Sequence, residues 1–251
     1  MSQRIEVLPL DAQLHVQRAE LERQHADWPA ALADYERAGE LDPTIDMDLS
    51  RGRTLLESGQ PREALPLLER FLAHSPEHPP ALLYRARALV KLDRRPEALK
   101  DYRAALKYTP LPEPDLVRET ADIMAADGLQ QEALDVICSG IEKLGAIPAL
   151  TLRAMDLEIA TQNFPAALRR SDTMQQTAPR PEPWMARRAS ILAQAGRIDE
   201  SRAEWLKLVD HLASLPNLER GSHAMSSLLE DAVQALASLD SVQNSEERHA
   251  P

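Results

Sequence analysis

Seven histidines and one cysteine are the residues of this 251-residue chain that could support metal or nucleophilic chemistry. His74 and His78 stand closest together, in the sequence HSPEH, where two imidazoles could share a metal ion. We expect no metal site there, because no cysteine or carboxylate set completes a ligand shell. A reactive thiol needs a basic neighbour, and we expect Cys138 to be inert and at least half-buried.

Motifs of catalytic sites are missing from the sequence. It contains no HExxH, no glycine-rich phosphate loop, no nucleophile elbow and no Cys–His signature. The many aspartates and glutamates are interpreted as solvated helix faces rather than acid/base pairs. The sequence therefore predicts a protein that is not an enzyme and needs no cofactor. A hidden hydrolase or transferase stays as an alternative.

Composition and charge narrow the class of protein further. Hydrophobic residues make up 43% of the chain and aromatic residues only 4%, and strong helix formers dominate. A formal net charge of -11 disfavours binding to nucleic acid or anionic lipid, which needs a concentrated positive field. No apolar run is long enough to insert into a membrane. The first residues, MSQRIEVLPLDAQ, lack a signal-peptide core, so the sequence as written predicts a cytoplasmic protein, or a periplasmic one if a leader has been removed.

The strongest pattern is a set of residues that recurs about every 34 positions. An alanine after a short turn, replaced by serine in the last copy, recurs at intervals of 33, 34, 35, 34 and 34 residues. Three columns keep this register: the anchor itself, the residue four positions after it, and a mostly small residue twelve positions before it. The anchors are Ala31, Ala64, Ala98, Ala133, Ala167 and Ser201; the second column is Tyr35, Leu68, Tyr102, Ile137, Ser171 and Trp205; the third is Ala19, Gly52, Ala86, Ala121, Met155 and Ala189.

Each copy is expected to form a hairpin of two helices. Apolar residues spaced by four and then three positions form one face of a helix, which places the anchor on the second helix. A proline beside the anchor fits a first helical turn, and a proline twelve residues after it ends that helix. The small residue lies in the preceding helix and lets the two backbones approach closely.

The pattern resembles the tetratricopeptide repeat, and its composition resembles that of bacterial members of the family. The resemblance implies an all-α fold: a right-handed α-solenoid superhelix of about six helix pairs with a C-terminal capping helix. Copies four to six depart from the pattern, notably at Ser171 and Ser201, and we expect them to pack less regularly. The expected organisation is an N-terminal extension over 1–10; repeats over 11–216, at about 12–44, 45–78, 79–113, 114–147, 148–181 and 182–216; a capping helix over 217–239; and a disordered polar tail over 240–251.

The resemblance also implies a functional surface, because the first helices of such repeats line a groove that binds a peptide or a partner protein. The basic and apolar residues expected there suit a ligand that carries carboxylates, which arginine can hold with two parallel hydrogen bonds. Acidic residues further along would give the groove polarity. The candidate groove residues are Leu49, Arg53, Leu83, Tyr84, Arg87, Lys91, Arg118, Asp122 and Asp156.

The sequence therefore predicts a non-enzymatic scaffold or adaptor that supports assembly of a complex. Two alternatives stay open: the arginines could pair with Glu57, Glu119 or Asp122 instead of a partner, and the chain could self-associate into a homo-oligomer through its terminal helices. We expect that reversing Arg87 and Arg118 together to glutamate weakens partner capture and leaves the helical circular dichroism and the melting temperature nearly unchanged.

Overall fold

The computed structural model describes residues 11–216 and 222–249, with side chains up to residue 240, and over these residues it contains helices and no strand. The described helices divide into two compact units, unit 1 up to residue 128 and unit 2 from residue 129 onward. The predicted all-α fold is confirmed. No helix in the described residues is long and apolar enough to cross a membrane.

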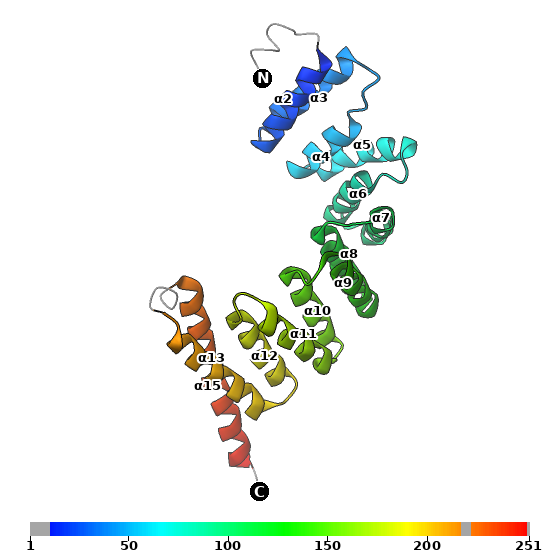
Figure 1. Ribbon diagram of the computed structural model, residues 1–251. Coiled ribbons are helices and arrows are strands. Elements are labelled where there is room, and N and C mark those ends of the chain that lie inside the picture. The colour runs from blue at the N-terminus through cyan, green and yellow to red at the C-terminus, as the bar shows by residue number, and fades with distance from the viewer. Residues whose placement is uncertain (1–10, 217–221, 250–251) are drawn as a thin grey trace. The chain divides into compact units, whose positions relative to one another are not determined.

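Within each unit, each helix packs against the next one in the sequence (Figure 1). Unit 1 contains α2 (Ala12–Gln24), α3 (Trp28–Leu41), α4 (Asp48–Glu57), α5 (Pro61–His74), α6 (Pro79–Lys91), α7 (Arg95–Tyr108) and α8 (Pro114–Ala126). Unit 2 contains α9 (Gln130–Leu144), α10 (Pro148–Ala160), α11 (Phe164–Thr177), α12 (Glu182–Gln194), α13 (Ile198–Ser214) and α15 (His223–His249).

The last helix differs from the expected capping helix in its bounds. It continues to His249, so residues 240–249, predicted as a disordered tail, are helical. Three of its buried side chains, Met225, Ala232 and Leu239, join the core that Trp205 and Leu208 of α13 form. The predicted extension over 1–10, residues 217–221 and residues 250–251 lie outside the described residues.

A left-handed backbone turn recurs five residues before every anchor. Glycine occupies this position at Gly59, Gly128 and Gly196, where φ lies between 73° and 82°. The same turn is made by residues with side chains at Ala26, Asp93 and Gln162. Glycine is the residue best suited to this region, because a Cβ atom crowds the following carbonyl there. The repetition of the turn shows that one local geometry is imposed on three unfavourable residue types.

Small buried residues let the helices of a hairpin approach closely. The anchors are fully buried from Ala31 to Ser201, and so are five of the six residues in the third column, the sixth being buried Gly52. A Cβ atom placed on Gly52 would lie 2.9 Å from Cγ of Leu68, the second-column residue of its hairpin. Leu68 is itself fully buried. Glycine at position 52 therefore sets the spacing of α4 and α5.

The fifth copy reverses the sizes of these two residues. Where the second copy has Gly52 and Leu68, the fifth has Met155 on α10 and Ser171 on α11, and both are fully buried. The hydroxyl of Ser171 donates a hydrogen bond to the carbonyl oxygen of Trp184 at 3.0 Å. The departures from the repeat pattern are thus compensated by an exchange of volume and by a hydrogen bond that satisfies the buried hydroxyl.

The last anchor is satisfied in a similar way. The hydroxyl of Ser201 donates to the carbonyl oxygen of Ala189 at 2.8 Å, across the hairpin of α12 and α13. Serine is larger than the alanine of the other copies by only one hydroxyl group, and that group is hydrogen-bonded. Position 201 therefore keeps the close helix contact.

Arginine–carboxylate pairs tie the two helices of some hairpins at a position next to the small residues. Arg85 on α6 binds Asp101 on α7 with two parallel hydrogen bonds of 2.7 Å. Arg18 makes the same contacts to Asp34 in the hairpin of α2 and α3. Burial raises the pKa of Asp34, but hydrogen bonds from Arg18 and His15 outweigh it and hold that pKa below its ordinary value.

A double-mutant cycle tests the volume exchange in the fifth copy. We expect Met155→Ala to cost about 2–5 kcal/mol of stability and Ser171→Leu about 1–3 kcal/mol, since one leaves a cavity and the other overfills the core. The double variant restores the small–large order of the second copy. Its loss of stability is expected to be smaller than the sum of the two single losses by about 0.5–3 kcal/mol. Urea unfolding of the four proteins measures this coupling. Additive losses would show that the two positions do not share space.

Candidate functional site

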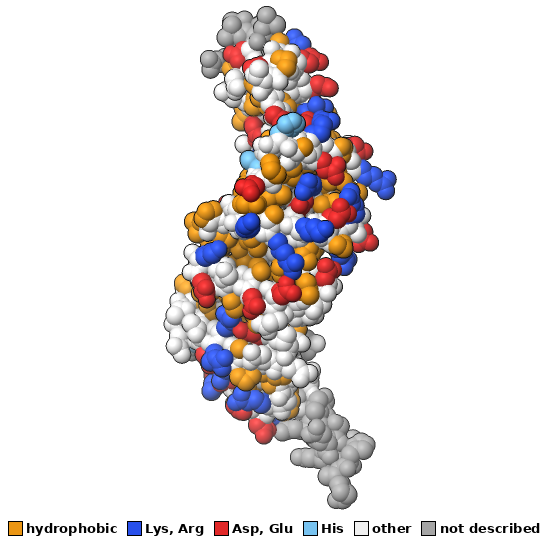
Figure 2. Space-filling model, turned by 90° about the vertical axis from the view of Figure 1, so that its right-hand side faces the viewer, with side chains coloured by type: hydrophobic (Ala, Val, Ile, Leu, Met, Phe, Trp, Pro, Cys, Tyr) orange, Lys and Arg blue, Asp and Glu red, His pale blue; other side chains and the backbone are white. Residues whose placement is uncertain are grey.

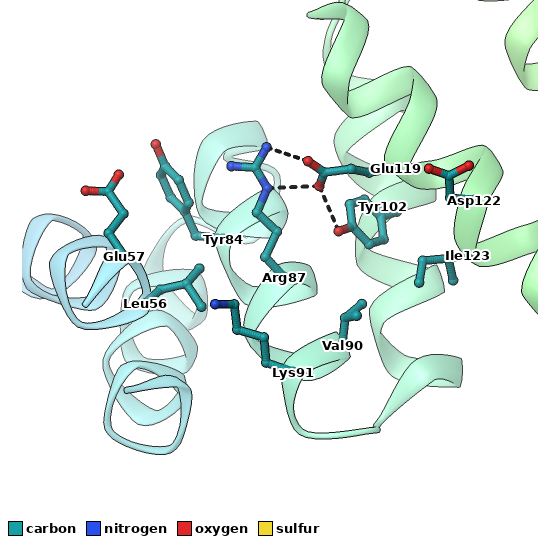
Figure 3. Close-up of a pocket in the computed structure, with 10 residues that line it drawn as sticks. All are labelled: Leu56, Glu57, Tyr84, Arg87, Val90, Lys91, Tyr102, Glu119, Asp122 and Ile123. Atoms are coloured by element: carbon teal, nitrogen blue, oxygen red, sulfur yellow. Dashed lines mark hydrogen bonds and ion pairs between the residues drawn. The ribbon is translucent and has the colours of Figure 1, made fainter. Parts of the chain in front are cut away.

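A hollow of about 420 Å³ in unit 1 brings together side chains from four helices (Figure 3). We call it the groove pocket. It is lined by Leu56 and Glu57 of α4, Tyr84, Arg87, Val90 and Lys91 of α6, Tyr102 of α7, and Glu119, Asp122 and Ile123 of α8. Helical spacing explains the set from α6, because positions 84, 87 and 91 share one face at intervals of three and four residues.

One side of the groove pocket is apolar. Leu56, Val90 and Ile123 lie along it, each from a different helix, and the aliphatic chain of Lys91 reaches toward Leu56 (Figure 3). Leu56 is buried, while Val90 and Ile123 are half-buried and keep part of their surface available to a ligand. An apolar side chain placed here would lose its water-exposed area without displacing any protein group.

The other side is held by a carboxylate that joins three helices. Glu119 on α8 accepts two hydrogen bonds of 2.9 Å from the guanidinium of Arg87 on α6 and one of 2.9 Å from the hydroxyl of Tyr102 on α7 (Figure 3). Burial lowers the pKa of Arg87, and the hydrogen bond and charge of Glu119 more than offset this, so its pKa is raised. This network fixes the pocket wall before any ligand arrives.

The ring of Tyr84 lies close to two guanidinium groups. Cζ of Arg53 is 5.5 Å from the ring centroid and Cζ of Arg87 is 6.0 Å from it. Both distances fall within the range of cation–π attraction. Arg53 also donates to Glu57 at 2.9 Å, and the second oxygen of Glu57 accepts from Arg23 at 2.7 Å. The arginines therefore position the aromatic ring instead of standing free.

The structure brings four of the predicted groove residues into one pocket and distributes the others. Tyr84, Arg87, Lys91 and Asp122 all line the groove pocket. Arg53 is not among the lining residues, but its Cζ lies 5.5 Å from the ring centroid of Tyr84. Three more predicted residues play other parts: Leu49 packs against the core, Leu83 lines a neighbouring hollow described below, and Asp156 lies in unit 2, where it pairs with Arg187.

The predicted basic patch is neutralised by carboxylates. Arg53, Arg87 and Arg118 are each ion-paired, with Glu57, Glu119 and Asp122 respectively. Charges of both signs are also interspersed over the face of the molecule that Figure 2 shows. Of the two readings that the sequence left open, the structure contains the paired one. Lys91 is different, because it is exposed and no other described side chain pairs with it.

This pairing corrects the expected effect of charge reversal. Arg87→Glu would place a carboxylate beside Glu119, where a bidentate ion pair now joins α6 and α8. Breaking a partly buried pair and adding like-charge repulsion destabilises the fold. The double reversal of Arg87 and Arg118 is therefore not expected to leave the melting temperature unchanged, and Lys91 is the better position for testing ligand binding.

The sequence analysis did not place Glu119 and Tyr102 among the pocket residues. Glu119 was considered only as a partner that might quench an arginine, and Tyr102 only as a core residue. A signal was available for Glu119, because it lies one residue after Arg118 on the predicted first helix of the fourth copy. Its contact with Tyr102, however, joins different copies and depends on how adjacent hairpins stack.

A second hollow of about 510 Å³ lies on α6, α7 and α8 and shares Tyr84 and Arg87 with the groove pocket. We call it the proline pocket, because prolines form much of its wall. Its other lining residues are Pro79, Pro80, Leu83, Tyr108, Thr109, Pro110, Glu113, Asp115 and Leu116.

Histidine, acidic and cysteine side chains are the groups that could support metal or thiol chemistry. Among the residues that the structure describes, no three His, Cys, Asp or Glu side chains are grouped so as to hold a metal ion. Cys138 is half-buried and, unlike the sequence expectation, has a basic neighbour: Nη2 of Arg170 lies 3.0 Å from its Sγ. The same guanidinium donates to the buried Glu158 at 2.7 Å, so its charge is shared with a carboxylate.

Comparison with known proteins gives one family match, over part of the chain. Residues 55–116, which include most of the groove pocket, match the tetratricopeptide repeat family model. None of the curated proteins compared matches the chain.

Solved structures give the fold of a much larger part of the chain. A tetratricopeptide repeat protein from Parabacteroides merdae superposes with a TM-score of 0.61 at 17% identity, covering 92% of both chains. PilF from Pseudomonas aeruginosa gives a TM-score of 0.62 at 15% identity over 88% of this chain and 97% of its own. MamA gives 0.56 at 15% identity over 67% and 96%. At these identities the likeness shows the fold alone.

The contact between Tyr102 and Glu119 predicts a loss of stability at alkaline pH. Burial raises the pKa of Tyr102, and the charge and hydrogen bond of Glu119 raise it further. The folded protein then keeps a proton that the unfolded chain releases above pH about 10, so the free energy of unfolding falls as pH rises beyond that value. We expect Tyr102→Phe to flatten this decline between pH about 9 and 12, measured by urea unfolding. An unchanged slope would contradict the burial and hydrogen bonding of the phenol.

Proposed function

We propose that this chain, which has the tetratricopeptide repeat fold and matches that family's model over residues 55–116, is a non-enzymatic scaffold that binds a segment of a partner protein in the groove pocket and so supports assembly of a complex. Proteins with this fold generally act as protein-interaction scaffolds rather than enzymes. The observation that carries the proposal is an apolar hollow whose rim is already fixed by ion pairs.

The size and lining of the pocket support a peptide ligand. A volume of about 420 Å³ is within the range of small-ligand sites and accommodates an apolar side chain with part of its backbone. The bidentate Arg87–Glu119 pair and the stacked Tyr84 keep their positions without a ligand, so little conformational entropy is lost on binding. Such a site favours capture of an extended or helical segment over chemical conversion of it.

The interactions of the charged groups in the pocket also favour binding over catalysis. Glu119 accepts three hydrogen bonds and Asp122 pairs with Arg118 at 3.1 Å, so both carboxylates are engaged. A general acid or base needs a group poised to exchange a proton with a substrate. The Tyr102 hydroxyl does not meet this need, because its pKa is raised by burial and by Glu119.

Site-specific photo-cross-linking tests the proposal directly. A photoreactive amino acid is introduced at Lys91, on the rim of the groove pocket, and in a matched protein at Lys100, an exposed lysine of α7. Each variant is expressed in the native host and irradiated, and adducts are identified by mass spectrometry. We expect position 91 to give an adduct with one peptide segment of another protein and position 100 to give none.

Both proteins must first show the same helical circular dichroism and melting temperature. Equal labelling at the two positions, or adducts from position 100 alone, would place the interaction surface away from the groove pocket. Adducts of position 91 with the chain itself would instead support the homo-oligomer alternative.

A further inference from the structure

We infer, on the basis of the proposed function, that the bound segment places one apolar side chain in the groove pocket and a second one in the proline pocket, in a fixed direction. The segment carries a carboxylate beside the apolar side chain in the groove pocket and a cationic side chain beside the apolar side chain in the proline pocket. The inference concerns how a ligand is oriented, and rests on the relation of the two hollows and on the charges that they leave unpaired.

The two hollows are adjacent and share one wall. Tyr84 and Arg87, one helical turn apart on α6, line both of them. Tyr84 lies within cation–π distance of Arg53 as well as Arg87, and Arg87 is bound to Glu119, so contacts within the protein position both residues of the shared wall. A segment that fills one hollow and continues across this wall meets the other, which gives two anchoring points on one ligand.

The proline pocket is built to stay open. Pro79 and Pro80 form the first turn of α6, and Pro110 follows the end of α7, so the backbone of its walls has little freedom. Tyr108 completes the wall, and its hydroxyl donates to Glu77 at 2.7 Å. The hollow therefore offers rigid apolar and aromatic surface without requiring rearrangement.

Unpaired charge distinguishes the two ends. Lys91 at the groove pocket and Glu113 at the proline pocket are exposed, and the described part of the chain contains no ion-pair partner for either of them. The guanidinium of Arg87, which faces both hollows, is neutralised by Glu119. A ligand thus meets an unpaired lysine at one end and an unpaired glutamate at the other.

Neighbouring charges preserve this difference. The N-terminus of α8 offsets about half of a negative charge near Glu113. Asp115 adds a second carboxylate to the proline pocket, and its pairing with Arg118 is long, at 3.4 Å, while Arg118 is shared with Asp122 at 3.1 Å. At the other end, Glu57 is engaged by both Arg53 and Arg23 and does not cancel Lys91. The charge pattern selects the direction of a segment more than its affinity.

Selection from a random peptide library tests the inference. A displayed library of twelve-residue random peptides is panned against the immobilised whole chain and against the variants Lys91→Glu and Glu113→Lys, which alter exposed side chains only. We expect wild-type selections to share two apolar residues, with Asp or Glu beside one and Lys or Arg beside the other. Lys91→Glu is expected to exchange the acidic preference for a basic one and leave the second preference intact; Glu113→Lys does the converse.

Affinities of one selected peptide, measured by fluorescence anisotropy, give the size of the effect. Each charge reversal is expected to weaken binding about two- to fivefold, as for exposed ion pairs, and a peptide with the matching charge reversed restores it. Tyr84→Ala, with its fold verified by circular dichroism, removes the aromatic part of the shared wall. This change is expected to abolish binding of the selected peptide and of its charge-reversed counterpart.

The outcomes separate the inference from the proposed function. Peptides that depend on Tyr84 but are indifferent to both charge reversals would overturn the polarity and leave the groove pocket as the binding site. Peptides that bind equally well after Tyr84→Ala, or a library that yields none, would overturn the proposed function and the polarity together.

Discussion

The close approach of paired helices is the constraint on which the rest of the structure depends. It requires side chains of almost no volume at two facing columns, which Gly52 and the buried alanines supply. Where the fifth copy breaks the pattern, Met155 and Ser171 exchange sizes, so the total volume is kept although the residue types are not. Close packing penalises a gap and an overlap alike, and this explains why the departures occur as a compensating pair.

Fixed spacing between hairpins allows charged side chains from different helices to form ion pairs on the surface. Because α6 and α8 lie at a set distance, Arg87 can reach Glu119 with both of its hydrogen bonds, and Tyr102 can reach the same carboxylate from α7. The pairs cancel the charge that the sequence places on these helices and hold the aromatic and apolar side chains of the pocket in place. A surface that is neutral, apolar and pre-formed is suited to binding, and its few unpaired ions are left to orient what binds.

Much of the fold could be predicted, because the determinants are local. The prolines that open second helices, such as Pro61 and Pro96, occupy the first helical turn as expected. The end of α15 was not predicted, since its polar last residues carry no apolar stripe that would reveal a helix. The candidate site was predicted in part: Tyr84, Arg87 and Lys91 follow from helical spacing on one helix, whereas Glu119 and Tyr102 reach the pocket only through the stacking of neighbouring hairpins.

The sequence by itself determined the repeat period, the helical hairpins, the buried columns and the absence of recognised catalytic motifs, because each of these depends on residues within one copy. Only the tertiary structure decided which charges remain available. The sequence does not distinguish Lys91 from Arg53, Arg87 and Arg118, since all four are basic residues of the expected groove. In the part of the chain that the structure describes, carboxylates pair with the three arginines and not with the lysine. The physical reason is that an ion pair needs two groups within about 4 Å, and the Arg87–Glu119 distance is set by the packing of separate hairpins.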